Sequence, residues 1–338
     1  MNIAFFRIEP WEREYIESRE EFKKLGAKAV FFDEGLDQDH IPTDTGAEVI
    51  CTFIDSKITK PVLDAFPNVK LITTRSTGFD HIDLEECKKR GIQVANVPKY
   101  GENTVAEYTF GLILALVRKI YHSYDQIRET GSFDLQGMRG MDLKGKTLGV
   151  IGTGSIGQNV ARIARGFEMQ VIACDKYPNQ QAAKEVGFDY CEPERAIRES
   201  DILTLHVPYT KETHHLINKD NIFTMKKGAY LINTSRGQVI ETEALVKALH
   251  EGHLGGAALD VFEEEGVIKD ELEFLLQGSS EKPDLKTVLA NHVLVDMPNV
   301  IVTPHNAFNT WEALQRILDT TIQNMRGFQE GKPVNLVG

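Results

Sequence analysis

Three glycines with the spacing G-x-G-x-x-G give the strongest local indication of chemistry. Gly152, Gly154 and Gly157 directly follow an apolar run, and Asp175 ends the next apolar run along the chain. In this setting the first glycine permits a tight turn, the second lets the backbone approach a pyrophosphate, and the third lets a helix pack closely on a strand. A glycine-rich turn can also be purely structural, but the strand, the helix and the distal aspartate together favour a ligand. A carboxylate at Asp175 accepts hydrogen bonds from an adenosine ribose and repels a 2′-phosphate, so the pattern predicts NAD rather than NADP.

Two further residues suited to anion and proton chemistry follow apolar runs. Arg236, in LINTSRG, can bind a carboxylate through both arms of its guanidinium. His305, in VTPHNAF, can act as a general acid, which typically contributes about 10²–10⁴ in rate. Between them, ALDVFEEEG carries four carboxylates, Asp260, Glu263, Glu264 and Glu265. Taken singly, Arg236 could form a surface salt bridge, His305 could be structural, and the acidic run could be a solvated loop. The residues alone do not select one of the glutamates as functional.

Reduction of a 2-oxo acid requires all of these groups together. A nicotinamide supplies the hydride, a cation stabilises the carboxylate and the growing charge on the carbonyl oxygen, and a general acid protonates that oxygen. A histidine beside a carboxylate meets the last need. Ligands bind at the carboxyl ends of parallel strands, so three strand ends of one sheet would bring these groups to one edge. The combination predicts NAD-dependent hydride transfer to or from a small 2-hydroxy acid.

The apolar pattern also predicts the elements that position these residues. Short β-branched runs alternate with amphipathic segments, which is typical of parallel strands joined by right-handed crossovers. We expect one series of strands at 2–6, 29–32, 49–53, 71–73 and 93–95, and a second at 147–151, 170–174, 202–207, 230–233, 256–260 and 300–303. Helical patterns cover 12–25, 84–90, 103–131 and 311–330. Residues 264–299 are predicted to form loop and short helix.

Chain length and the two strand series predict two domains. At 338 residues the chain exceeds the usual domain size of about 150 residues. The first series lacks a closing helix, so the helical pattern at 311–330 is expected to return to it. We therefore expect a discontinuous substrate domain, 1–100 plus 305–338, with a nucleotide-binding domain, 101–304, inserted into it.

Composition and charge limit the classes of partner. The net charge of -12 at pH 7 provides no basic surface for nucleic acid or anionic membranes. The most apolar stretch, 108–117, is too short to cross a bilayer, and the N-terminus lacks a signal-peptide pattern. The four cysteines show no metal-ligand spacing, which predicts reduced thiols and no metal site. We expect a cytoplasmic protein with a small-molecule substrate.

Several motifs, taken in order, carry a resemblance across nearly the whole chain. They are VIGTGSIG, LHVPYTKETHHLIN, INTSRG, ALDVFEEE and TPHNAF, and they resemble the D-isomer-specific 2-hydroxyacid dehydrogenase family. The resemblance implies an α/β fold in which a Rossmann NAD-binding domain is inserted into a smaller flavodoxin-like substrate domain, and usually a homodimer built on the cofactor domains. It also implies a catalytic set of Arg236, Glu265 and His305. In that family the histidine is the acid–base group, the glutamate orients it and favours its protonated form, and the arginine orients the substrate.

The same resemblance assigns further contacts. Besides the three glycines and Asp175, cofactor contacts are assigned to Ser155, Ile156, Val207, Pro208, Thr213, Thr234, Ser235, Arg236 and Asp260. The segment TRSTGFDHIDLEECKKRGI resembles the substrate loop of the family, which implies that N–H groups around Ser76, Thr77 and Gly78 bind the substrate carboxylate alongside Arg236. NVPKYGENTVAE resembles a segment of the D-lactate dehydrogenase branch and implies that Tyr100 lies near the substrate.

The expected substrate pair within the family is D-lactate and pyruvate. The wide spacing between Glu265 and His305 resembles the D-lactate branch. HNAFNT departs from that branch, which usually has an aromatic pair before the threonine. Asn306 and Asn309 therefore leave open a reductase of glyoxylate, hydroxypyruvate or a bulkier 2-oxo acid.

More distant alternatives share parts of the pattern. Phosphite dehydrogenases have a similar catalytic set, formate dehydrogenases lack the glutamate, and many phosphoglycerate dehydrogenases carry an extra regulatory domain. A non-enzymatic, NAD-responsive corepressor-like scaffold is the competing class.

Overall fold

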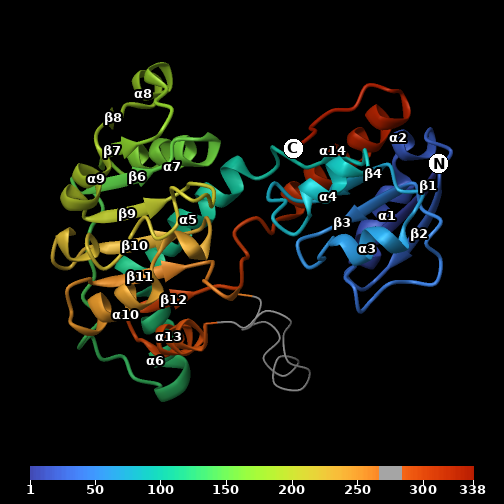
Figure 1. Cartoon of the computed structure of the whole chain (residues 1–338). Coiled ribbons are helices and arrows are strands. Elements are labelled where there is room, and N and C mark those ends of the chain that lie inside the picture. The colour runs from blue at the N-terminus through green and yellow to red at the C-terminus, as the bar shows by residue number, and fades with distance from the viewer. Residues whose placement is uncertain (266–283) are drawn as a thin grey trace. The chain divides into compact units, whose positions relative to one another are not determined.

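The computed structural model describes residues 1–265 and 284–338, which form two compact units (Figure 1). The first unit combines Met1–Tyr100 with Asn309–Gly338, and the second comprises Gly101–Phe308. Each unit is built on a parallel sheet with helices on both faces. This arrangement confirms the predicted α/β class.

The sheet of the first unit has the strand order β2-β1-β3-β4-β5, with every pair parallel. Its strands are β1 Asn2–Phe6, β2 Lys28–Phe32, β3 Val49–Thr52, β4 Leu71–Thr74 and β5 Gln93–Ala95. This is the flavodoxin-like order, in which the chain reverses its direction across the sheet between β1 and β3. The carboxyl ends of the strands near that reversal are the usual ligand edge of such a sheet.

The helices of the first unit come from both ends of the chain. They are α1 Pro10–Ser18, α2 Glu20–Lys23, α3 Lys60–Ala65, α4 Leu84–Lys89 and α14 Trp311–Gln329. The core on one face of the sheet includes α3 and α4, and the core on the other includes α1, α2 and α14. Leu318, Ile322 and Met325 of α14 are buried in the same cluster as Phe5 and Val49. The C-terminal helix is therefore part of the core of the N-terminal sheet.

The sheet of the second unit has the parallel order β8-β7-β6-β9-β10-β11-β12. Its strands are β6 Thr147–Ile151, β7 Gln170–Cys174, β8 Asp189–Tyr190, β9 Ile202–Leu205, β10 Tyr230–Asn233, β11 Gly256–Leu259 and β12 Val300–Val302. The first six strands follow the doubly wound 3-2-1-4-5-6 order of dinucleotide-binding sheets, and β12 extends one edge. The order reverses between β6 and β9, where such sheets bind their ligands.

Helices cover both faces of this second sheet (Figure 1). They are α5 Glu102–Val117, α6 Ile120–Thr130, α7 Ser155–Gly166, α8 Gln180–Val186, α9 Pro193–Glu199, α10 Thr242–His250 and α13 Leu285–Asp296, with 3-10 turns at Ile222–Thr224 and Gly237–Val239. The core of one face includes α5, α7 and α8, and that of the other includes α9, α10 and α13. No helix in the described ranges is long and apolar enough to cross a membrane.

The helical pattern predicted at 103–131 is interrupted in the structure, between α5 and α6. Lys119 adopts a left-handed conformation with φ of 56°. The carbonyl of Val117 accepts the N–H of Met141 at 2.9 Å instead of continuing the helix. Gly140 packs so closely here that a Cβ on it would lie 2.4 Å from the same carbonyl oxygen. A tertiary contact therefore ends a helix that local periodicity would extend.

The helix predicted at 12–25 is also divided, between α1 and α2. Arg19 is extended, with ψ of 127°, and its guanidinium forms an ion pair with Asp319 of α14 at 3.0 Å. Phe22 of α2 is buried in the cluster that contains Leu318. Because the amphipathic pattern continues through both helices, the break is not predictable from local periodicity.

Two elements of the second unit differ from the prediction. Strand β8 was missed because two residues are too few to show a pattern, although the N–H of Cys191 continues its pairing by donating to Ala173 O at 2.8 Å. Loop and short helix were predicted for 264–299, but α13 is a twelve-residue helix. The carboxylate of Asp284 caps α13 by accepting the N–H of Lys286 at 3.0 Å. The rest of that prediction, at 266–283, lies outside the described residues.

Candidate active site

The turn between β6 and α7 is tight where strand meets helix. Gly152 adopts φ of +92°, and a Cβ on it would lie 2.5 Å from the carbonyl oxygen of His206. A Cβ on Gly157 would lie 2.0 Å from the carbonyl oxygen of Gly152, whereas one on Gly154 would meet no atom within 4 Å. The backbone at Gly154 therefore faces open space, which fits the close approach of a pyrophosphate.

The N-terminus of α7 offers hydrogen-bond donors to such an anion. Gly154 is the N-cap residue and provides no side-chain cap. The N–H groups of Ser155 and Ile156 donate to no acceptor within the described ranges. The start of a helix also carries partial positive charge, so both residues fit the predicted contacts to the cofactor phosphates.

Asp175, directly after β7, is held beside the glycine turn. Its Oδ2 accepts hydrogen bonds from the N–H of Thr153 at 2.6 Å and from the Thr153 hydroxyl at 3.1 Å, and its Oδ1 accepts the N–H of Tyr177 at 2.8 Å. The hydroxyl of Tyr190, on β8, lies 2.7 Å from the Thr153 hydroxyl and accepts the N–H of Asn179. Sequence reasoning missed Thr153 and Tyr190, because β8 left no pattern and the x position of G-x-G carries no chemical signal.

The turn that carries Arg236 is shaped by the buried side chain of Asn233, at the end of β10. The amide oxygen of Asn233 accepts the N–H of Ser235 at 3.0 Å and its hydroxyl at 2.8 Å, and the amide nitrogen donates to the carbonyl of Arg236 at 2.8 Å. The Arg236 guanidinium donates to the carbonyl of Ser235 at 2.8 Å. Thr234, between them, has its hydroxyl 3.0 Å from that of Thr109 on α5. Asn233 was not predicted, although it precedes the TSRG motif directly.

Gly237 brings the arginine turn against the acidic run. A Cβ on Gly237 would lie 1.8 Å from the carbonyl carbon of Phe262, 2.0 Å from its oxygen and 2.3 Å from the nitrogen of Glu263. These are backbone atoms, so the contact cannot be relieved by a side-chain rotation. Only glycine allows the turns after β10 and β11 to approach this closely.

The structure separates the glutamates that the sequence left equivalent. Glu265 faces His305, with Oε1 and Oε2 at 3.1 and 3.3 Å from Nδ1. Glu263 instead bonds His215 and Thr242. The side chains of Glu265 and His305 are 25% and 26% exposed, so the pair is open to a ligand while partly removed from water.

Asp260 holds the loop that carries His305. Its buried carboxylate accepts the hydroxyl of Thr303 and the N–H groups of Asn306 and Ala307, the latter two at 2.8 and 2.9 Å. Its carbonyl accepts the N–H of His305 at 2.9 Å. Burial raises the pKa of Asp260, and its hydrogen bonds oppose that rise. The loop is thereby fixed although His305 has φ of 53°, an uncommon value for a residue other than glycine.

His206 lies at the same sheet edge but cannot serve as the proton donor. Burial lowers its pKa to about 3, and its Nε2 lies 2.9 Å from the hydroxyl of Thr204. The ring is therefore neutral at physiological pH. Of these two histidines at strand ends, His305 is the one with a carboxylate partner and partial exposure.

The remaining predicted cofactor residues in the second unit follow β9. Val207 and Pro208 come after its carboxyl end, and the hydroxyl of Thr213 closes the following turn by donating to the carbonyl of Pro208 at 2.6 Å. The glycine turn, Asp175, the arginine turn and the Glu265–His305 pair thus all follow the carboxyl ends of strands in one parallel sheet.

The predicted carboxylate-binding loop at 76–78 lies in the first unit, after β4. The hydroxyl of Ser76 donates to the carbonyl of Gly78 at 2.6 Å, and Asn96 donates to the carbonyl of Thr77 at 2.8 Å. The N–H groups of Ser76, Thr77 and Gly78 themselves donate to no acceptor in the chain as described. A fixed loop with free donors can bind an anion. Tyr100, in the same unit, accepts a hydrogen bond at its carbonyl from Arg316 of α14 at 2.6 Å.

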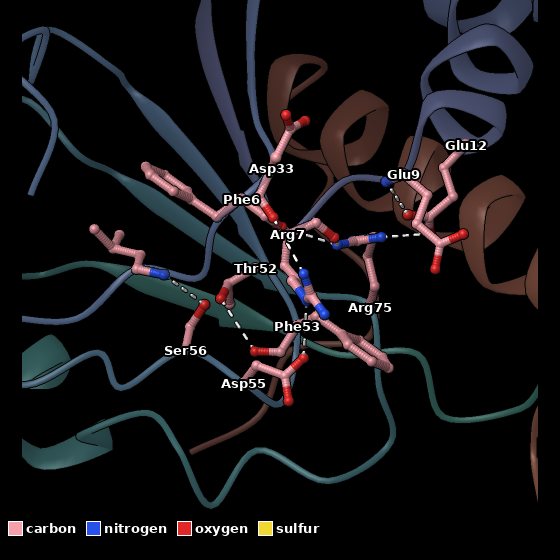
Figure 2. Close-up of polar contacts among 11 residues, drawn as sticks. Phe6, Arg7, Glu9, Glu12, Asp33, Thr52, Phe53, Asp55, Ser56 and Arg75 are labelled. Atoms are coloured by element: carbon pink, nitrogen blue, oxygen red, sulfur yellow. Dashed lines mark hydrogen bonds and ion pairs between the residues drawn. The ribbon is translucent and has the colours of Figure 1, made fainter. Parts of the chain in front are cut away.

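A buried arginine anchors the start of this loop (Figure 2). Arg75 is 2% exposed, pairs with the carboxylate of Glu12 on α1, and donates to the carbonyls of Phe6 and Arg7 at the end of β1. Its guanidinium also lies over the ring of Phe53, 5.4 Å from the centroid. These contacts tie the ends of β1, β3 and β4 together directly before residue 76.

Comparison with a family model supports the cofactor assignment. Residues 110–307 match the model described as "D-isomer specific 2-hydroxyacid dehydrogenase, NAD binding domain". The match covers the second unit almost completely, including the glycine turn, Asp175, Arg236 and the Glu265–His305 pair.

Individual relatives resemble the chain over most of its length. D-lactate dehydrogenase of Escherichia coli (strain K12) is 35% identical, covering 98% of each chain. Glyoxylate reductase of Thermofilum pendens is 40% identical, covering 84% of this chain and 78% of its own. The structure of D-lactate dehydrogenase from Aquifex aeolicus complexed with NAD and lactic acid is 37% identical, with a TM-score of 0.83 and coverage of 98% and 96%. The chain therefore belongs to the NAD-dependent D-isomer specific 2-hydroxyacid dehydrogenases.

Proposed function

We propose that the protein interconverts pyruvate and D-lactate with NAD as the hydride carrier. The observation that carries the proposal is the bonded pair of Glu265 and His305 on the ligand edge of a nucleotide-binding sheet, together with the turn of Arg236. In the reducing direction, pyruvate, NADH and one proton yield D-lactate and NAD⁺.

The cofactor supplies the hydride, and His305 supplies the proton. Its imidazolium donates the Nε2 proton to the oxygen that becomes negative as the carbonyl carbon is reduced, and in the reverse direction the same nitrogen accepts it. Glu265 accepts from Nδ1, which fixes the tautomer and orients the ring. A carboxylate in this position also stabilises the protonated ring before transfer.

Cationic and N–H groups bind the anionic substrate. The guanidinium of Arg236 presents a rigid fork of donors, which stabilises the charge that develops on the substrate oxygen. The free N–H groups at residues 76–78 are proposed to bind the substrate carboxylate. Local donors of this kind are required because the whole protein carries a net charge of -12, which opposes the approach of anions.

Two relatives support different substrates within this chemistry. The E. coli D-lactate dehydrogenase matches 98% of the chain, which favours pyruvate. The glyoxylate reductase of Thermofilum pendens matches a smaller share at higher identity, which makes glyoxylate the second candidate.

A substrate panel tests the proposal. Initial rates of NADH oxidation at neutral pH are measured with pyruvate, glyoxylate, hydroxypyruvate, phenylpyruvate and 2-oxoisocaproate, and the product of the best substrate is resolved on a chiral column. The highest kcat/KM on pyruvate with D-lactate as product is expected. A higher value on another oxo acid would replace the substrate and retain the mechanism. No turnover by protein that binds NADH would refute the enzymatic proposal and favour a scaffold.

Replacing Asp175 with alanine is expected to reduce the preference for NADH over NADPH at least about tenfold. The change removes a charged acceptor of ribose hydrogen bonds, worth roughly 1.5–3 kcal/mol, and the repulsion of a 2′-phosphate. The ratio of kcat/KM values for the two cofactors measures the effect. Asp189→Ala, on the neighbouring strand β8, is the control and should leave the ratio unchanged; an unchanged ratio in Asp175→Ala would exclude the ribose contact.

We also propose that the protein is a homodimer built on α6. No residue of α6 is buried, and Ile120, Tyr124 and Ile127 form an exposed apolar stripe. Phe133 and Leu135, in the segment that follows, are 81% and 82% exposed. Apolar faces of this kind commonly mark protein–protein contacts, and a symmetric pair of identical faces forms a closed dimer.

The double substitution Phe133→Asp and Leu135→Asp is expected to convert the dimer into monomer, since burying a carboxylate without a partner in an apolar contact is strongly unfavourable. Sedimentation velocity at micromolar protein concentration measures the change. Val334→Asp, which alters an exposed apolar residue of the first unit, should leave the dimer intact. A monomeric wild-type protein would contradict the proposal.

We place the protein in the cytoplasm. All four cysteines are free thiols. Cys174 and Cys191 remain unlinked although Cys174 ends β7 and Cys191 directly follows β8, which pairs with β7. Unlinked thiols are typical of a reducing compartment.

A further inference from the structure

The carboxylate of Glu263, two residues before Glu265, is bonded through both oxygens. Its Oε1 lies 2.7 Å from Nε2 of His215. Its Oε2 accepts the N–H of Thr242 at 3.0 Å and the Thr242 hydroxyl at 2.6 Å. The Glu263 side chain is only 12% exposed, so these bonds are largely shielded from water. None of these partners belongs to the proposed cofactor or substrate contacts.

The backbone of Glu263 is held as well. Its carbonyl accepts the side-chain amide of Asn291 on α13 at 2.8 Å. Asn291 is fully buried, and its own amide oxygen has no partner among the atoms described. Because a buried amide needs hydrogen-bond partners, the bond from the Asn291 nitrogen holds the backbone of Glu263 against α13.

The partners of Glu263 also connect to the turn of Arg236. The N–H of His215 donates to the carbonyl of Gln238 at 2.9 Å, two residues after Arg236. His215 reaches this position with φ of 49°, an uncommon backbone conformation for a non-glycine residue. Gly237 packs directly on the peptide between Phe262 and Glu263. The turns after β10 and β11 therefore form one fixed unit around Glu263.

We propose that Glu263 is a positioning residue, which directs Glu265 toward His305 by anchoring the turn to His215, Thr242 and Asn291. The inference rests on the proposed function. Glu265 follows Glu263 by two residues, and Glu264 between them has φ of 52°, so the direction of Glu265 depends on the turn formed by Glu263 and Glu264. Loss of the anchor would leave the Glu265 carboxylate free to move away from Nδ1 of His305.

The expected size of the effect follows from the geometry. A displacement of about 1 Å in a catalytic group can cost roughly 10²-fold in rate. Loosening the turn weakens the Glu265 contact without removing the carboxylate, so a smaller loss than in Glu265→Gln is expected.

The test compares Glu263→Ala and Glu263→Gln with Glu265→Gln and with a control. Glu241→Ala is the matched control. Glu241 precedes Thr242 at the start of α10 and, like Glu263, accepts a backbone N–H through its carboxylate, that of Lys219 at 2.7 Å, but it has no hydrogen bond to the described 263–265 turn. For each variant kcat and KM for pyruvate reduction are measured from pH 5 to pH 10, with thermal unfolding as a check of the fold. Glu263→Gln retains the size of the side chain and an acceptor for Thr242, so it keeps the test valid if Glu263→Ala unfolds.

Glu265→Gln is expected to move the alkaline limb of the kcat profile to lower pH, because the protonated ring loses its carboxylate. Glu263→Ala should move the limb in the same direction and lower kcat about tenfold, and Glu263→Gln should do so to a lesser degree. Glu241→Ala should retain the wild-type profile. In the double variant Glu263→Ala/Glu265→Gln, kcat should match that of Glu265→Gln alone, because the anchor has no remaining carboxylate to position.

Two results would overturn the inference while leaving the proposed function intact. One is a shifted profile in Glu265→Gln beside a wild-type profile in both Glu263 variants. The other is a full additive loss in the double variant. An unshifted profile in Glu265→Gln would instead refute the proposed function of the Glu265–His305 pair, and this inference with it.

Discussion

Replacing His305 with glutamine is expected to lower kcat for pyruvate reduction about 10²–10⁴-fold, the usual contribution of general acid catalysis. Glutamine has no proton to transfer at neutral pH, although it can keep a hydrogen bond to Glu265. The loop itself is held by Asp260 through Thr303, Asn306 and Ala307, so the substitution leaves its anchors in place. Steady-state rates of NADH oxidation measure the loss.

The affinity for NADH provides an internal control for this variant. His305 is not among the expected cofactor contacts, so the dissociation constant of NADH, measured by fluorescence, should remain close to the wild-type value. His250→Gln, on the exposed end of α10, should leave kcat unchanged. A near-normal kcat in His305→Gln would remove this histidine from the mechanism.

Replacing Gly237 with alanine is expected to damage both stability and catalysis. The added Cβ would lie 1.8–2.3 Å from three backbone atoms of Phe262 and Glu263. Overpacking of a closely packed site commonly costs about 1–3 kcal/mol, and the overlap here is relieved only by separating two turns. Because one turn carries Arg236 and the other Glu265, kcat should fall at least about tenfold even in the fraction that folds.

Urea unfolding and steady-state kinetics measure the two effects. Gly111→Ala is the matched control, since Gly111 lies on α5 and a Cβ there would meet no atom within 4 Å. That variant should be as stable as wild type or more stable by up to about 1 kcal/mol, because alanine favours helix. Wild-type stability and kcat in Gly237→Ala would show that the turns separate at little cost.

The fold was largely predictable because buried parallel strands appear as uninterrupted apolar runs. Strands β6, β7 and β10 have the bounds that the sequence predicted, since helices cover both faces and no polar alternation blurs their ends. Helix boundaries were less predictable. The break at Lys119 depends on Met141, and the break at Arg19 depends on Asp319, which are contacts that a local pattern does not contain.

The site was predictable in its location but not in its pairing. Motifs identified the strand ends where Arg236 and His305 lie, because chemistry at a parallel sheet concentrates there. The residues themselves left the choice among the glutamates open, and only the resemblance to a family selected Glu265. Glu263 and Glu265 are identical in type and differ in partner because of the backbone of the turn. Asn233 was missed for a related reason: a buried amide that shapes a turn has no distinctive spacing.

The two-part composition of the first unit has a consequence for synthesis of the protein. The hydroxyl of Tyr15 bonds Asp319, 304 residues later in the chain. At about 5–20 residues per second, the ribosome needs roughly 15–60 s to span that distance. During this time the face of the N-terminal sheet that includes Phe5, Val49 and Leu71 has no α14 to cover it. The nascent N-terminal segment is therefore exposed to aggregation while the second unit emerges, and a chain ending before Asn309 would never complete its first unit.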